Sequence, residues 1–223
     1  MKHSDDIVYV PARTRLGDTI IAVNNAIALS KQLGKKIRFA LNPKLKTWTK
    51  ENDYNSVQSC IQRLEAAFFL LKHENHLELC DYTKIKDWIE LPKLPINSLI
   101  ENAKSNNAAK INFACYDFFP ATPRNRFSFK QRKEIVNYLT KKKIPLINCH
   151  DAANQFGLIK AIELMASCEH FIGADSGMSH IAHVLNLKVH IIRQGSSPEH
   201  VAKWHAGCSY FLYDNVYDFI DRF

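Results

Sequence analysis

Long hydrophobic runs and paired cysteine motifs are missing from this sequence, and both absences narrow the classes of protein. No run of about 18 apolar residues occurs, so we expect no transmembrane helix. Asp5 and Asp6 interrupt the basic-then-apolar pattern of a signal peptide, so we expect none at the N-terminus. The 6 cysteines form no Cys-X-X-Cys pair and lie mostly in apolar runs. They predict reduced, mostly buried thiols of a cytoplasmic protein and argue against a zinc site.

Short-period repeats and low-complexity tracts are also missing, and the composition is that of an ordinary globular protein. With 46% hydrophobic and 23% charged residues, the 223 residues suffice for one large domain or two small ones. The net charge of +8 favours anionic partners such as nucleotides, phosphorylated glycans, anionic lipid or nucleic acid. For the run Lys141-Lys142-Lys143 the alternative is a solvated helix end, where cations suit the helix dipole.

Strands and helices alternate along the chain. The apolar periodicity predicts strands at 6–12, 36–41, 111–116, 145–149, 170–174 and 188–193, and helices at about 18–33, 56–71, 129–143, 157–168 and 178–187. Gly34 is expected to end the first helix, and Ser128 to cap the helix at 129–143. The polar stretch 101–110 predicts a boundary between domains 1–107 and 108–223. The alternation predicts two Rossmann-type α/β units with parallel sheets.

The segment FIGADSGMSHIAH (171–183) places a polar turn between a predicted buried strand and a predicted helix. In open α/β sheets, ligands bind at the carboxyl ends of strands, and the N–H groups that begin a helix bind phosphate. Gly177 allows close backbone approach, Ser176 can bond a phosphate oxygen, and Asp175 suits sugar hydroxyls. The alternative is that Asp175 or Ser176 only caps the helix.

Two histidines, His180 and His183, lie three positions apart on one face of the helix predicted at 178–187. A metal pair would need further ligands, and the sequence shows no obvious one. His180 stands one turn beyond the loop, from where its side chain could point back at a ligand. His183 is expected to serve packing or to lie at the surface.

The segment 171–205 resembles the C-terminal motif region of family 9 glycosyltransferases, the lipopolysaccharide heptosyltransferase family. The matching residues are Asp175, Ser176, Gly177, His180, Ala182, Gly195 and Pro198. The segment RTRLGDTIIAVNNAIALSKQLGKKIRFA (13–40) independently resembles the family's first loop and helix, with Leu16-Gly17-Asp18 in the loop. Together the resemblance covers about residues 6–41 and 111–205, with one motif in each half.

The resemblance implies a GT-B architecture, in which two Rossmann-like domains face each other across a cleft, here with a shortened N-terminal domain. It implies a metal-independent transferase without a cofactor. The donor is a nucleoside-diphosphate sugar, with heptose as one candidate, and binds the C-terminal domain. The acceptor is a saccharide, free or lipid-linked, of lipopolysaccharide or a surface glycan. The enzyme is then cytoplasmic, with peripheral contact to the inner membrane for a lipid-linked acceptor.

Residue by residue, the resemblance assigns Asp18 as the general base that takes the proton of the acceptor hydroxyl, although an Asp there also suits a helix cap. Asp175 matches the residue that holds donor-sugar hydroxyls. Ser176 and Gly177 match the backbone donors to the diphosphate, and His180 belongs to the same donor motif.

Arginines near both motifs are further candidates for binding anions, since a guanidinium makes bidentate phosphate contacts. Arg124 or Arg126 stands where the family has a basic side chain after the first strand of the second domain, unless this loop is only solvated. Arg13 and Arg15 flank the loop at Gly17 and are candidates to hold an anionic acceptor or the diphosphate.

Departures from the family pattern keep other function classes open. The acidic residue expected after the second strand of the C-terminal domain is missing, and His150-Asp151 stands there instead. One alternative is a DNA-modifying glycosyltransferase, favoured by the +8 charge but lacking a basic strip interleaved with aromatic residues. The other is a nucleotide-sugar-binding protein without catalysis. Nucleic acid is therefore a less favoured partner than a nucleotide-sugar donor and a saccharide acceptor.

Overall fold

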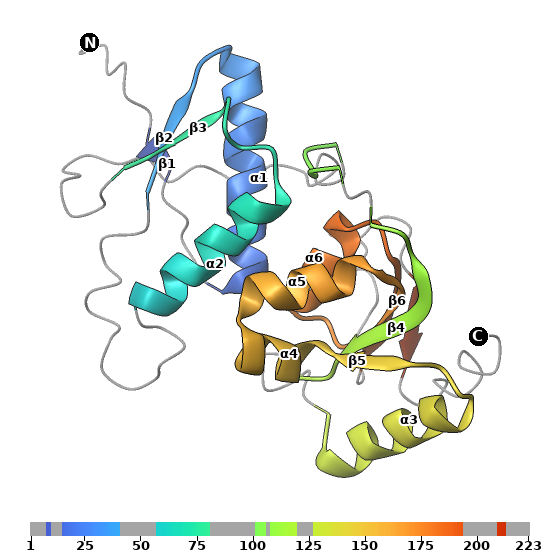
Figure 1. Cartoon of the computed structure of the whole chain (residues 1–223). Coiled ribbons are helices and arrows are strands. Elements are labelled where there is room, and N and C mark those ends of the chain that lie inside the picture. The colour runs from blue at the N-terminus through green and yellow to red at the C-terminus, as the bar shows by residue number, and fades with distance from the viewer. Residues whose placement is uncertain are drawn as a thin grey trace. The chain divides into compact units, whose positions relative to one another are not determined.

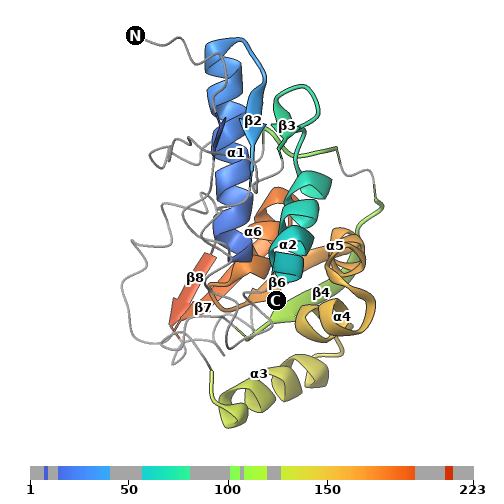
Figure 2. The same ribbon diagram turned by 90° about the vertical axis from the view of Figure 1, so that its left-hand side faces the viewer.

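The chain forms two compact units, Met1–Lys104 and Ser105–Phe223. The computed structural model (Figures 1 and 2) describes residues 8–9, 15–40, 57–80, 101–105, 108–119, 127–193 and 209–212. Over these ranges no helix is long and apolar enough to cross a membrane. Both units are built from parallel strands and helices, so the predicted α/β class is confirmed.

The N-terminal unit alternates strand and helix around a sheet of the order β1-β2-β3. Its elements are β1 (Val8–Tyr9), α1 (Leu16–Leu33), β2 (Ile37–Phe39), α2 (Val57–Leu70) and β3 (Leu77–Leu79). Both pairings are parallel. The helices predicted at 18–33 and 56–71 are confirmed to within two residues at each end. Gly34 ends α1 in the left-handed conformation, at φ 64°, as expected of a glycine there.

Helix α1 is stabilised by the burial of its apolar face and by a hydrogen bond and a negative charge in its first turn. Ile20, Val23 and Ile27 have no exposed surface and form part of the core of this unit. The Thr19 hydroxyl donates to the carbonyl oxygen of Arg15 at 3.0 Å. Asp18 lies in the first turn, where its charge suits the positive end of the helix dipole. The start of α1 is therefore fixed locally, and with it the position of Asp18.

The C-terminal unit holds a five-stranded parallel sheet of the order β5-β4-β6-β7-β8. Its elements are β4 (Ile111–Asp117), α3 (Phe129–Lys141), β5 (Leu146–Asn148), α4 (Cys149–Phe156), α5 (Leu158–Ala166), β6 (Cys168–Gly173), α6 (Gly177–Val184), β7 (Lys188–Arg193) and β8 (Ser209–Leu212). Helix α3 packs on one face of the sheet, and α4, α5 and α6 lie on the other (Figure 1).

Helix α3 confirms the predicted cap and inner face. The Ser128 side chain accepts from the Gln131 N–H at 3.2 Å, and the Gln131 side chain accepts from the Ser128 N–H at 2.8 Å. Ile135 and Leu139 are fully buried against the sheet, and Val136 is partly buried there. Local sequence alone thus fixes where this helix begins and which side faces the core.

Two elements of this unit differ from the sequence-based expectation. The helix predicted at 157–168 is confirmed as α5 to within two residues at each end, but α4 before it was not predicted; the two helices meet at Gly157, whose φ is 86°. Helix α4 starts directly after β5, where the Asn148 side chain accepts from the N–H groups of His150 and Asp151. Strand β8 was not predicted.

The cysteines behave as predicted within the described ranges. Cys60, Cys115, Cys149 and Cys168 are buried, Cys80 is half-buried, and all five are free thiols. Burial raises the pKa of the Cys115 thiol far above its usual range, which keeps it protonated and unreactive. These thiols therefore serve as small apolar core residues.

The strand order creates a switch point in the C-terminal sheet. The first strand of this unit, β4, lies between β5 and β6. The chain therefore runs from β4 to β5 on one side, and then crosses to β6 on the other side of β4. Ligands of open α/β sheets bind outside the carboxyl ends of the strands at such a point. Here those ends are Asp117 of β4 and Gly173 of β6, which are paired in the register.

Candidate functional site

The turn Asp175-Ser176-Gly177 lies at the switch point. Strand β6 ends at Gly173 and α6 begins at Gly177, so these residues connect the carboxyl end of a central strand to the start of a helix. All three are half-buried. The Ser179 N–H donates to the Ser176 carbonyl oxygen at 3.2 Å. The N–H groups of Gly177 and Met178, the first two of α6, have no carbonyl within the helix to bond, so they suit an anion. The turn therefore has the position that the sequence predicted for it.

Asp117, which the sequence analysis did not select, is the buried carboxylate of this site. It is 3% exposed at the carboxyl end of β4. Its Oδ2 accepts a hydrogen bond from the Ser176 hydroxyl at 2.7 Å, and its Oδ1 accepts from the Phe119 N–H at 2.9 Å. Burial raises the pKa of the Asp117 carboxyl, while the Ser176 hydroxyl, the Phe119 N–H and His150 oppose that rise. Its place after a predicted strand was the signal that could have found it.

The start of α6 is capped mainly by Ser179. The Ser179 hydroxyl donates to the Ser176 carbonyl oxygen at 2.7 Å and accepts from the Ser176 N–H at 3.3 Å. The Ser176 hydroxyl donates across the sheet to Asp117 instead. Ser176 thus links β4 to α6 through its side chain. Capping of the helix, one of the two interpretations of Ser176 from the sequence, does not account for this hydrogen bond.

Gly173 lets the ends of β4 and β6 approach closely. The Ala174 N–H donates to the Asp117 carbonyl oxygen at 2.8 Å. A Cβ on Gly173 would lie 2.3 Å from that same oxygen, closer than any real contact. Only glycine therefore fits between the two strand ends in this geometry.

Replacing Gly173 with alanine is expected to destabilise the protein by about 1–3 kcal/mol, because one strand end must shift to remove the overlap. The shift would also disturb the Ser176–Asp117 hydrogen bond next to it. Urea unfolding of the wild type and the variant measures the difference. Unchanged stability would mean that the strand ends separate at no cost.

A stack of three planar side chains lies beside Asp117. The Phe119 ring is stacked on the His150 ring, with centroids 4.4 Å apart and planes 17° apart. The Arg132 guanidinium carbon lies 4.3 Å from the centre of the same Phe119 ring. The pair His150-Asp151 occupies the position where the family resemblance expects an acidic residue, and the His150 ring of this pair is part of the stack.

His180 and His183 are both buried on α6, at 9% exposure each. Burial, together with the charge of His183, lowers the pKa of His180 to about 4. Burial also lowers the pKa of His183. At neutral pH both imidazoles are therefore neutral, and neither adds positive charge for a diphosphate. The expectation that His183 serves packing agrees with its burial.

In the N-terminal unit, the predicted residues lie at the start of α1. Arg15 is exposed at the N-cap position, Gly17 is buried, and Asp18 is half-buried as the third residue of the helix. Arg13, Arg124 and Arg126 lie outside the described residues, so their roles stay predictions. Asp18 belongs to one unit and the Asp175-Ser176-Gly177 turn to the other.

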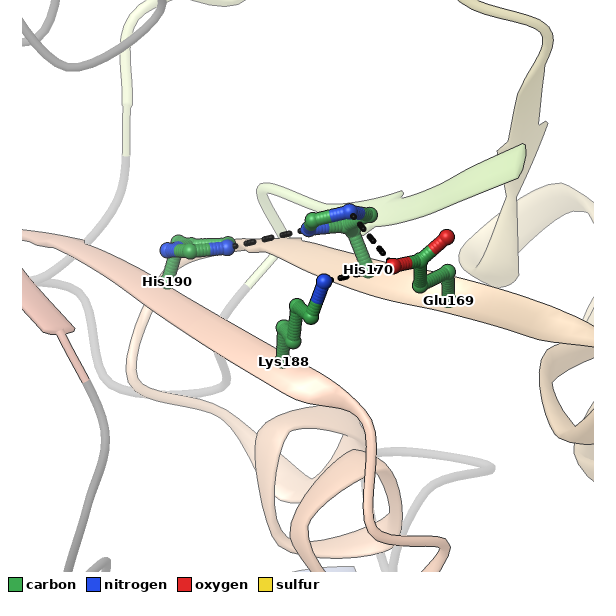
Figure 3. A network of polar contacts seen from close by, with 4 residues as sticks. All are labelled: Glu169, His170, Lys188 and His190. Atoms are coloured by element: carbon green, nitrogen blue, oxygen red, sulfur yellow. Dashed lines mark hydrogen bonds and ion pairs between the residues drawn. The ribbon is translucent and has the colours of Figure 1, made fainter. Parts of the chain in front are cut away.

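Figure 3 shows a second polar network, formed by neighbouring strands within the sheet. The Nδ1 atom of His170 on β6 lies 3.3 Å from the Nε2 atom of His190 on β7. Glu169 accepts from Lys188 at 2.5 Å and lies 3.7 Å from His170. Burial lowers the pKa of His170 and lowers that of His190 to about 4. Within the described ranges, no group of three or more His, Cys, Asp or Glu could hold a metal ion.

Comparison with known proteins adds information on the fold. No protein-family model matches the sequence, and no curated protein matches it. Solved structures do. The glycosyl transferase family 9 protein from Veillonella parvula has a TM-score of 0.52 and 11% identity, over 100% of this chain and 90% of that one. The E. coli heptosyltransferase WaaC with ADP has a TM-score of 0.51 and 9% identity, over 97% and 99%.

The dodecameric iron-containing heptosyltransferase TibC from enterotoxigenic E. coli, solved with ADP-D-beta-D-heptose, has a TM-score of 0.56 and 11% identity. That match spans 91% of this chain and 60% of the TibC chain. This chain shares their fold. The two α/β units with parallel sheets have the GT-B-like fold of these solved structures, and the length of 223 residues is consistent with a shortened domain. At these identities the likeness shows the fold alone.

Proposed function

We propose that the protein is a glycosyltransferase that moves a sugar from a nucleoside-diphosphate sugar to a saccharide acceptor. The observation that carries the proposal is the Asp175-Ser176-Gly177 turn at the switch point of a parallel sheet, at the start of α6. Its position suits a diphosphate on the helix N-terminus with a sugar beside the Asp175 carboxylate. The solved structures of the same fold, two of which hold ADP or ADP-heptose, support a donor of this chemical class.

The chemistry assigned to the chain follows from these groups. The acceptor hydroxyl attacks the anomeric carbon of the donor sugar, and the bond from that carbon to the diphosphate breaks. Asp18 takes the hydroxyl proton as general base. The leaving diphosphate gains negative charge, which the N–H groups at the start of α6 stabilise. Asp175 accepts hydrogen bonds from sugar hydroxyls and so orients the donor.

Further details of the proposal concern partners and metal. The acceptor is proposed to be a saccharide of lipopolysaccharide or a surface glycan, with heptose as the first donor sugar to test. For a lipid-linked acceptor, the basic protein would work at the anionic inner face of the membrane. The step is proposed to need no metal. The iron-containing TibC makes an assay with and without a chelator necessary.

Thermal unfolding in a panel of nucleoside diphosphates and nucleotide sugars tests the donor site. A ligand at about 100 times its Kd is expected to add about 2.7 kcal/mol to the free energy of unfolding. Stabilisation by one nucleotide class would support the site and select the donor for transfer assays. If no nucleotide stabilises the protein and no transfer occurs to glycan or DNA acceptors, the enzyme assignment is overturned.

A further inference from the structure

We propose that Asp117 couples diphosphate binding at the switch point to the uptake of one proton, so that its carboxyl group is neutral when the anion is bound. The inference rests on the proposed function, because it takes the diphosphate as the ligand. It adds a residue that the sequence motifs do not contain, and it predicts how affinity for the donor depends on pH.

The buried carboxylate of Asp117 lies one hydrogen bond away from Ser176 of the proposed anion site. Asp117 is 3% exposed, and one hydrogen bond of 2.7 Å joins it to the hydroxyl of Ser176, the residue that precedes α6. An anion bonded to the Ser176 hydroxyl would lie about 5 Å from this carboxylate, two hydrogen-bond lengths away. Two unit charges that close, partly shielded from water, weaken binding by up to about a hundredfold.

The surroundings of Asp117 determine how this repulsion is relieved. His150 on α4 favours the charged carboxylate, and Arg132 on α3 lies beyond the Phe119 ring. Asp175 adds a second carboxylate in the turn before α6, and Arg193 ends β7, the next strand after β6. Burial already disfavours the charged form of Asp117 before any anion arrives. An incoming diphosphate adds to that effect, so uptake of a proton by Asp117 relieves the repulsion.

The hydroxyl of Ser176 gives the coupling a structural consequence. While Asp117 is charged, it accepts the hydroxyl hydrogen of Ser176, which then cannot be donated to a phosphate oxygen. Once Asp117 is protonated, its own hydroxyl can donate to Ser176 Oγ, and the Ser176 hydrogen is released for the ligand. Proton uptake therefore removes a repulsive charge and supplies a hydrogen-bond donor in one event.

The test is isothermal titration calorimetry with ADP and with inorganic pyrophosphate, from pH 5.5 to 8.5, on the wild type and Asp117→Asn. Repeating each titration in two buffers of different ionisation enthalpy counts the protons taken up. The variant is isosteric, and its amide oxygen can still accept from the Phe119 N–H. Glu163→Gln on α5 is the matched control, because it removes one exposed carboxylate from the same unit.

At pH 8, Asp117→Asn is expected to bind ADP about tenfold more tightly than the wild type. The wild type is expected to lose about tenfold more affinity than Asp117→Asn between pH 5.5 and 8.5, and to take up more protons on binding. Titration of ADP itself is common to all variants and cancels in the comparison. Glu163→Gln is expected to behave as the wild type.

Two results would overturn the inference while leaving the donor site intact. One is equal proton uptake by the wild type and Asp117→Asn. The other is a folded Asp117→Asn variant that binds ADP more weakly at every pH with the pH slope of the wild type, which would make Asp117 purely structural. If neither ADP nor pyrophosphate binds any variant, the proposed donor site fails and this inference fails with it.

Discussion

Replacing Asp18 with alanine is expected to lower the rate of sugar transfer by about 10²–10⁴-fold, the usual contribution of a general base. Binding of the nucleotide is expected to change by less than about threefold, because Asp18 lies in the N-terminal unit and the proposed donor residues in the C-terminal one. The measurement is kcat/KM for transfer together with the Kd of the nucleoside diphosphate that the thermal panel selects.

A second substitution separates the loss of the Asp18 carboxylate from the loss of side-chain volume. Asp18 also favours the start of α1 through the helix dipole, so its loss costs about 0.3–1 kcal/mol of stability. Asp18→Asn has nearly the same shape and the same loss of charge, and it is expected to be as inactive as Asp18→Ala. Glu65→Gln, an exposed residue of α2, is the control for a lost carboxylate in the same unit. Parallel loss of transfer and nucleotide binding in a folded Asp18→Ala protein would contradict the base assignment.

Acidification from about pH 6.5 to pH 4 is expected to destabilise the C-terminal unit strongly. The pKa values of His180 and His190 are about 4 in the folded protein, against 6.5 for an unperturbed histidine. Between these values the unfolded chain binds protons that the folded chain does not, so unfolding takes up protons and stability falls as the pH falls. Each histidine contributes a loss of about 3 kcal/mol over this window. Asp117 acts in the opposite direction, since burial raises its pKa.

Hydrogen exchange measured on peptides from β6 and β7, at pH 7.5, 5.5 and 4.5 with correction for intrinsic rates, follows this loss locally. His190→Gln removes one titrating ring from the pair with His170 and is expected to reduce the pH slope of the unfolding free energy by up to about 1.4 kcal/mol per pH unit. A slope that is the same in His190→Gln and the wild type would exclude His190 as a source of the acid sensitivity.

The sequence motifs and the comparison with solved structures agree on the fold. The resemblance to family 9 glycosyltransferases rests on two short motifs, and the structural likeness to heptosyltransferases confirms the fold with only 9–11% identity. Roles for Asp18, Asp175, Ser176 and Gly177 stay predictions until the variants are measured. The pair His150-Asp151 stands where the family pattern has its acidic residue, so the nucleotide preference is an experimental question, which the thermal panel addresses first.

The sequence by itself determined the features that depend on a few neighbouring residues. Gly34 ends α1 because a left-handed residue is needed there, and Ser128 with Gln131 begins α3 by reciprocal capping. The strand predicted at 188–193 coincides with β7. Caps, breaks and apolar periodicity act within one or two turns of chain, so local sequence carries them.

Tertiary structure alone decided which distant residues meet. The order β5-β4-β6-β7-β8 brings Asp117 next to Ser176, 59 positions later in the chain. It also places His170 of β6 next to His190 of the neighbouring strand β7. Strand order is set by how the helices cover the two faces of the sheet, which no local pattern encodes. Burial of Asp117 and of the histidines, and hence the direction of their pKa shifts, follows from the same packing. The switch point at β4 and β6 therefore became visible only in the folded chain, because it is a property of the sheet.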